Sequence, residues 1–201
     1  YVDNITVLKE KSDVKKELDE MTLEELWELF PIILVEHHDQ WIKWYQEEQD
    51  HLYSLLSKVD LVRIAHVGST AINGIWAKPT IDILIETKNK KEFEVVYQVL
   101  LDGGYSCMYK NERIGFNKGY TKDGFAERVF HIHVRNYGDH DELYFRDYMN
   151  EKSLLAKEYE DLKLELWKQY EHDRDGYTEA KTDFIKTYTE QAKKEYAGRY
   201  E

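Results

Sequence analysis

Short apolar runs fill the middle of the chain and divide it into strand-like segments. The runs are rich in β-branched and aromatic residues and are bounded by Gly, Asn and Asp, a pattern typical of β-strands. This pattern predicts strands over 61–67, 80–86, 105–109, 113–120 and 125–135. A Lys-Asp-Gly sequence at 122–124 predicts the turn between the last two strands.

Apolar residues recur at helical spacing on both sides of this middle region. Thr22 begins a capping-box pattern for a short helix that ends at Pro31, and a second helix is predicted to begin near Asp39. Asn89 is placed to cap a third helix, which a pair of glycines ends. From residue 141 onward the pattern is almost wholly helical and predicts three helices, with a break at 173–176.

This order of elements predicts an α/β fold (α+β in stricter schemes). It consists of a small mixed β-sheet flanked by helices, with a C-terminal helical extension. Residues 1–21 form a charged N-terminal segment, and residues 22–201 are expected to form a single domain. Within that domain we expect the sheet core over about 60–136 and the C-terminal helices over about 141–200.

Composition limits the classes of partner. The formal net charge is −12, from 40 Asp and Glu against 28 Lys and Arg, so general nucleic-acid binding through phosphate neutralisation is not expected. Cys107 is the single cysteine, which excludes an internal disulfide and fits a reducing compartment. No apolar run approaches a membrane span and no signal-peptide pattern is present, so we expect a cytoplasmic protein without a membrane partner.

The first candidate ligand site is the turn Gly68-Ser69-Thr70, which follows a predicted strand. Glycine leaves room for a ligand near the main chain, and the two hydroxyl residues stand at a predicted helix start, where anions are favoured. An alanine at position 68 is therefore expected to reduce ligand affinity more than stability. Lys78 lies in a loop that Pro79 restricts, where it can contact an anion, pair with an acid or remain solvated.

Asp82 is a single acid in the middle of an apolar strand, and a buried carboxylate needs a cation, a metal or hydrogen-bond donors. Because strand side chains alternate, Asp82, Leu84 and Glu86 share one face. Glu86 lies roughly 13 Å along the strand from Asp82, too far to bind the same ion. The plainer alternative is that Asp82 pairs with a neighbouring Lys, His or backbone N–H.

His131 and His133 share one face of a later strand. Two imidazoles at this spacing can bind one metal ion, with an acid or water completing the ligand set. If the two strands are neighbours, Asp82 and both histidines converge beside the Gly68 turn. Two interpretations stay open: a divalent metal site (Mg, Mn or Zn) formed by these three residues, or a polar cleft without metal.

The helical C-terminal region adds one more candidate. Arg146 can clamp a phosphate, with Asp147 orienting the guanidinium. Helix capping or ion pairing within this region is the favoured interpretation for Asp147. Arg63 is a weaker candidate, because a single arginine on a strand is commonly a surface charge.

Together these motifs resemble those of the GrpB family. The family's Gly-Ser-Thr turn and Lys-Pro-x-x-Asp segment look like those of the nucleotidyltransferase (DNA polymerase β-like) superfamily. The resemblance covers roughly residues 22–190. Besides the Gly68 turn and the Lys78–Asp82 segment, it is carried by Glu36-His37 to Trp41, Phe130-His131-Ile132-His133-Val134, Phe145-Arg146-Asp147-Tyr148, and Tyr159, Lys163, Tyr177 and Lys181.

The resemblance implies a protein that binds a nucleotide or another phosphorylated small molecule on the Gly68 turn. Metal-dependent nucleotidyl or phosphoryl transfer, with Asp82 as the catalytic acid, is then the first hypothesis. Leu84 stands where nucleotidyltransferases carry a second metal-binding carboxylate, which favours the alternative of a non-catalytic nucleotide-binding or accessory domain. The third hypothesis is a single-metal hydrolase that uses Asp82, His131 and His133.

Overall fold

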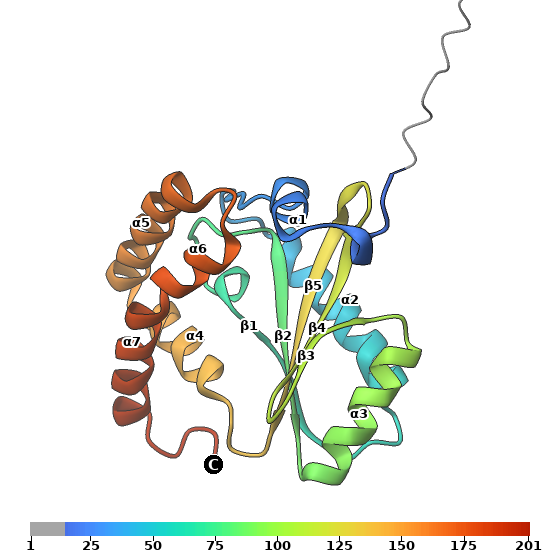
Figure 1. The fold of residues 1–201 in the computed structure, drawn as a ribbon. Helices are drawn as coiled ribbons and strands as arrows, with labels where there is room; N and C mark the ends of the chain where they lie inside the picture. The colour runs from blue at the N-terminus through green and yellow to red at the C-terminus, as the bar shows by residue number, and fades with distance from the viewer. Residues whose placement is uncertain (1–14) are drawn as a thin grey trace, which may run out of the picture.

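The computed structural model describes residues 15–201, so most of the predicted N-terminal segment lies outside the described residues. The described chain forms one five-stranded sheet, seven α-helices and two short 3-10 helices (Figure 1). Their bounds in chain order are η1 Leu18–Glu20, α1 Leu23–Leu29, α2 Gln40–Leu55, β1 Leu61–Val67, η2 Ser69–Ala71, β2 Thr80–Thr87, α3 Lys90–Asp102, β3 Ser106–Lys110, β4 Ile114–Thr121, β5 Gly124–Asn136, α4 Asp141–Glu151, α5 Ser153–Tyr170, α6 Arg174–Ala180 and α7 Thr182–Glu195.

The sheet is mixed, with strand order β1-β2-β5-β4-β3. Strands β2 and β5 run parallel in the centre, and every other neighbouring pair is antiparallel. In the parallel pair Asp82 lies opposite His131, and Leu84 lies opposite His133. The return from β1 to β2 places Val67 opposite Asp82, so the Gly68 turn begins beside that acid.

Side chains alternate between the two faces of the sheet along the central strands β2 and β5, and the two faces differ in character. Ile81, Ile83 and Ile85 point to one face and are completely buried. Helices α2 and α3 cover this face (Figure 1), and Trp41 and Phe93 anchor them in the main hydrophobic core. Burial of these apolar side chains is the main favourable contribution to folding, at about 25 cal/mol per Å² of apolar surface.

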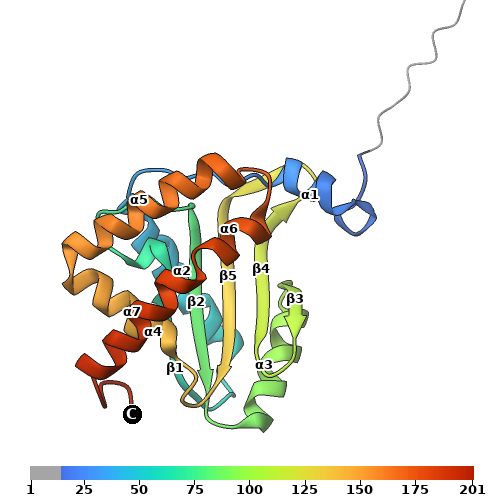
Figure 2. The same ribbon diagram turned by 60° about the vertical axis from the view of Figure 1, so that its left-hand side comes forward.

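The opposite face of β2 and β5 carries the polar residues and is covered by the C-terminal helices. Figures 1 and 2 show α4–α7 grouped on this side, and in Figure 2 α6 crosses in front of β2 and β5. A second core cluster, which includes Tyr144, Met149 and Tyr159, holds these helices together. The aromatic side chains of this region therefore serve mainly as packing surface.

The predicted fold class and the five predicted strands are confirmed, with strand ends within one or two residues. The C-terminal region contains four helices, so the prediction of three was wrong. The break was expected at 173–176, but α6 begins at Arg174. The Asp173 side chain accepts the Gly176 N–H, a cap that lets a glycine lie in the first turn of a helix.

The helix start expected at Ser69 is a single 3-10 turn of three residues, η2. Such a short element has no helix dipole with which to hold an anion, so any ligand contact here comes from individual backbone and hydroxyl groups. Among residues 15–201 no helix has the length and apolar character needed to cross a membrane.

Candidate functional site

A cavity of about 690 Å³ lies between the polar face of the sheet and the C-terminal helices. Strands β2 and β5 form its floor, the turn after β1 forms one wall, and α5–α7 close it from above. The cavity gathers most of the sequence-predicted site residues, namely Gly68, Ser69, Lys78, Asp82, His131 and His133.

Asp82 lies between two imidazoles at the cavity floor. Its Oδ1 atom is 2.8 Å from His133 Nε2 and 3.6 Å from His131 Nδ1. Burial opposes ionisation of Asp82, but hydrogen bonding and charge from the two histidines hold its pKa well below the usual range. Burial lowers the pKa of His131, which therefore favours the neutral ring. The predicted convergence of Asp82, His131 and His133 is present in the structure.

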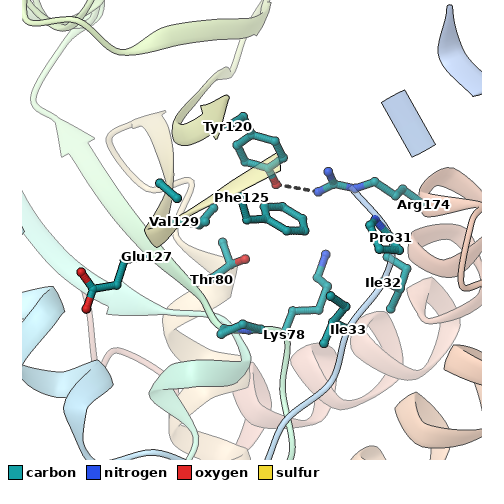
Figure 3. Close-up of a pocket in the computed structure, with 12 residues that line it drawn as sticks. Pro31, Ile32, Ile33, Lys78, Thr80, Tyr120, Phe125, Glu127, Val129 and Arg174 are labelled. Atoms are coloured by element: carbon teal, nitrogen blue, oxygen red, sulfur yellow. Dashed lines mark hydrogen bonds between the residues drawn. The ribbon is translucent and has the colours of Figure 1, made fainter. Parts of the chain in front are cut away.

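Tyr120 and Arg174 extend this arrangement beyond the histidines. The Tyr120 hydroxyl lies 2.7 Å from His131 Nε2, and Arg174 Nη2 donates to the same hydroxyl at 2.7 Å (Figure 3). With Arg174 donating to Tyr120, the Tyr120 O–H is free to donate to Nε2. His131 then carries its own proton on Nδ1, facing Asp82. No feature of the sequence pattern marked Tyr120 or Arg174, because they reach the site from β4 and α6.

Gly68 approaches the Asp82 side chain closely. Its φ of +73° is in the left-handed region that favours glycine. A Cβ atom at this position would lie 2.9 Å from both Cβ and Cγ of Asp82. The glycine therefore makes room for the carboxylate, and only indirectly for a ligand.

Three lysines form the opposite wall. Lys78 comes from the loop before β2, Lys163 from α5 and Lys181 from the junction of α6 and α7. Burial, together with neighbouring cations, lowers the pKa of Lys78 and of Lys163 to about 7. Burial also lowers the pKa of Lys181 to about 8. Within the described part of the chain none of the three forms an ion pair with a carboxylate.

Aromatic rings and one carbonyl group hold these amines in place. Lys163 Nζ donates to the Trp76 carbonyl oxygen and lies 4.7 Å from the centre of the Tyr159 ring. Lys181 and Lys78 lie 4.3 Å and 5.6 Å from the centre of the Tyr177 ring. Cation–π contacts of this kind compensate only part of the cost of burying a charge. The lysine wall is therefore an electropositive surface that lacks a matching anion.

Two predicted ligand contacts are not brought to the cavity. Thr70 is buried, and its hydroxyl donates to the Thr80 carbonyl oxygen. Arg146 contacts Asp147 through two nitrogens, at 2.9 Å and 2.8 Å, and donates to the His66 carbonyl oxygen at 2.8 Å. The structure thus uses Arg146 to join α4 to the end of β1, and the favoured interpretation of Asp147 as an ion-pair partner agrees with these contacts.

A separate polar network occupies the far end of β2. Glu86 is completely buried; it forms an ion pair with Arg63 Nε at 2.7 Å, accepts the Gly138 N–H and lies 2.9 Å from His140 Nδ1. Arg63, considered a weak anion contact from the sequence, also donates to the Tyr200 carbonyl oxygen. This network satisfies buried charges at the edge of the sheet and has no contact with the cavity floor.

The residues present do not fit a two-metal site. Leu84 is buried against Val67 and Leu143, and Glu86 is committed to the Arg63 network. Asp82 therefore has no second carboxylate beside it on β2. Across residues 15–201 no group of three or more His, Cys, Asp or Glu is arranged to hold an ion. The Asp82–His133 contact is a hydrogen bond between the ligands that a single-metal site would use.

Comparison with known proteins gives the family. The family described as "GrpB protein" matches residues 31–191, and the chain belongs to this family. The prediction from the sequence motifs is thus confirmed. The chain is 29% identical over 180 residues to the UPF0157 protein YqkA of Bacillus subtilis (strain 168), covering 87% of this chain and 52% of YqkA. It spans about half the length of that relative.

Solved structures resemble the fold to different degrees. GrpB from Enterococcus faecalis aligns with a TM-score of 0.70 and 26% identity, covering 82% of this chain and 99% of that one. The Cid1 poly(U) polymerase aligns with a TM-score of 0.46 and 13% identity, covering 74% of this chain and 45% of that one. The second likeness is too distant to carry an argument about ligand or activity.

Proposed function

We propose that the cavity binds a nucleotide or another phosphorylated small molecule, with its phosphate groups against Lys78, Lys163 and Lys181. The observation that carries this proposal is the lysine wall itself, because three partly or fully buried amines converge there without a carboxylate partner among the described residues. A phosphate offers only acceptor oxygens and up to two negative charges, and so complements ammonium donors.

The lowered lysine pKa values support the same ligand class. With pKa values of about 7 to 8, a fraction of these amines is neutral near pH 7 in the free protein. A bound anion stabilises the ammonium form and raises these pKa values, so part of the burial cost is recovered on binding. In a protein of net charge −12, this local concentration of cations is selective for small anions and does not favour an extended polyanion.

The Asp82–His133 pair favours a second candidate, proton transfer on the bound ligand. It lies on the cavity floor facing the lysine wall, and its carboxylate stays ionised while orienting an imidazole. In this candidate, His133 donates its Nε2–H to Asp82 and accepts a proton from a ligand hydroxyl or from water on Nδ1, in place of its 3.5 Å contact with Arg135 Nη2. Phosphoryl or nucleotidyl transfer is the reaction class that such a pair serves beside a phosphate site.

The test of binding compares anions on the wild type and two variants. Pyrophosphate, UMP and ATP are titrated by calorimetry into the wild type, Lys181→Met and Lys194→Met. Lys194 is an exposed lysine of α7 and serves as the matched control. We expect at least one of these anions to bind, and Lys181→Met to weaken it by about tenfold, which is about 1.4 kcal/mol. An equal loss in both variants, or no binding by any anion, would contradict the proposal.

A further inference from the structure

A second, smaller pocket of about 70 Å³ opens beside the main cavity (Figure 3). One side of it is formed by Ile32 and Ile33, which precede α2, and the other by Phe125 and Val129 of β5. Lys78 and Thr80 line both spaces. The pocket is thus an extension of the main cavity on the far side of Lys78.

The walls of this pocket are apolar and held in place. The Phe125 ring packs against Phe30 at 5.1 Å and against Tyr120 at 5.3 Å between ring centres. Even so, 38% of Phe125 and 41% of Ile33 remain exposed. Large apolar side chains that stay exposed around a hollow are typical of a binding site, because a ligand covers them at a gain in free energy.

Cations occupy one end of the pocket. Figure 3 shows the Lys78 amine and the Arg174 guanidinium on the same side, while the Glu127 carboxylate points away from them. In the part of the chain that the structure describes, Arg174 forms no ion pair and donates only to the Tyr120 hydroxyl. An occupant that is apolar at one end and anionic at the other matches this distribution of charge.

We infer that the small pocket is a subsite for a compact apolar or aromatic group of the ligand, whose phosphate lies at Lys78. The inference rests on the proposed function and narrows it to phosphate esters whose organic part is apolar and no larger than about one six-membered ring. The volume sets this limit, since an enclosed cavity of roughly 150 Å³ takes up benzene. A ring can enter this smaller pocket only by its edge, and a purine is too large for it.

The test separates the contribution of the organic group to binding from that of the phosphate. Inorganic phosphate, glycerol 3-phosphate and phenyl phosphate are titrated into the wild type, Phe125→Ala, Ile33→Ala and Tyr137→Ala. Tyr137 is 60% exposed, lies outside the pocket and provides the control for loss of an exposed aromatic side chain. Ile33→Ala repeats the test at a second exposed wall position if Phe125→Ala fails to fold.

We expect the wild type to bind phenyl phosphate about tenfold more tightly than the other two anions, because the ring buries apolar surface. Phe125→Ala and Ile33→Ala should reduce this preference to less than about threefold and leave inorganic phosphate binding unchanged. Tyr137→Ala should behave as wild type.

Equal affinity of the wild type for all three anions, with binding still dependent on Lys181, would overturn the subsite and leave the proposed function standing. The same loss of preference in Tyr137→Ala would also overturn the subsite. Failure of these three anions to bind, while pyrophosphate, UMP or ATP still binds, would overturn the subsite alone. Failure of all six to bind would overturn the proposed function and the subsite together.

Discussion

The α-carbon of Gly68 packs against the side chain of Asp82, in a position where a Cβ atom would lie 2.9 Å from the acid's Cβ and Cγ. The pairing of Val67 with Asp82 at the end of β1 creates this contact. The sequence pattern had suggested that the glycine makes room for an approaching phosphate. Its nearest neighbour is instead the carboxylate that two histidines orient, so the turn and the acid form one unit.

Substituting Gly68→Ala should therefore lower both stability and ligand affinity, which differs from the expectation drawn from the sequence. The positive φ and the contact with Asp82 together should cost about 1–3 kcal/mol of unfolding free energy. Gly74→Ala is the matched control, because Gly74 has a φ of +72° and a Cβ atom added there would meet nothing within 4 Å. The Gly74→Ala variant should show the loss of unfolding free energy that comes from backbone strain alone. Denaturant unfolding and calorimetry measure both quantities, and equal behaviour of the two variants would contradict the role assigned to Asp82.

The buried Lys163 should make stability depend on pH. It is 1% exposed, and burial lowers its pKa from 10.5 to about 7. Between these values the unfolded chain binds the proton and the folded chain does not, so unfolding free energy rises with pH through this window. The cost of burying the charged Lys163 amine is fully present below pH 7. Lys163→Met removes this cost at every pH. The unfolding free energy of the wild type should therefore rise by about 1–3 kcal/mol relative to that of the variant between pH 7 and pH 9.5.

Denaturant unfolding of wild type, Lys163→Met and Lys168→Met at several pH values checks this. The side chain of Lys168 is 74% exposed, so its variant should follow the wild-type pH curve. Parallel curves for wild type and Lys163→Met would show that the amine is not buried as a neutral group.

Anion binding should be coupled to proton uptake. Lys78 and Lys181 have pKa values of about 7 and 8, lowered by burial, and a bound anion favours their ammonium forms. The affinity for sulfate, a dianion that does not titrate in this range, should therefore weaken as pH rises from 7 to 9. Calorimetry at pH 8 in buffers of different ionisation enthalpy should detect about one proton taken up per sulfate bound. An affinity independent of pH, with no proton exchange, would argue against these lysines as the anion contact.

Loss of the Glu86 side chain should lower stability and leave ligand affinity unchanged. Glu86→Ala leaves Arg63 and the Gly138 N–H without their buried partner, a change that typically costs about 3–5 kcal/mol. The double variant Arg63→Ala/Glu86→Ala should recover part of this loss, because no uncompensated charge remains. Thermal unfolding of the three proteins, with pyrophosphate titrations, tests the separation of this network from the cavity. Loss of affinity in a variant that stays folded would contradict it.

Removal of divalent metal distinguishes the hypotheses left open by the sequence. In our proposal the lysines neutralise the phosphate, so EDTA should change the Kd of pyrophosphate by less than about twofold. A metal at Asp82, His131 and His133 would instead make binding or melting temperature depend on added Mg²⁺, Mn²⁺ or Zn²⁺. A rise in melting temperature with one of these ions that is absent in His133→Ala would replace our proposal with a metal site.

Alternation in the sequence was sufficient to predict the strands and the polar face. The period of two places Asp82 on one face of its strand and both histidines on one face of theirs. Their convergence followed once the strands were assumed to be neighbours, and the parallel β2–β5 pairing confirms that assumption. These features depend on local pattern, which is why they could be predicted from one chain.

Lys78 was a candidate from the sequence, but the other two lysines of the opposite wall depended on tertiary structure. Whether Lys163 and Lys181 face a cavity or solvent is decided by how α5–α7 pack on the sheet, and a charged position in a helix does not report this. Packing of α4 on β1 likewise turned Arg146 toward the His66 carbonyl oxygen, and packing of α6 brought Arg174 to Tyr120 beside His131. The sequence determined which residues carry the chemistry of the sheet. Only long-range packing decided which cations would face them, because contacts between distant segments leave no period in the chain.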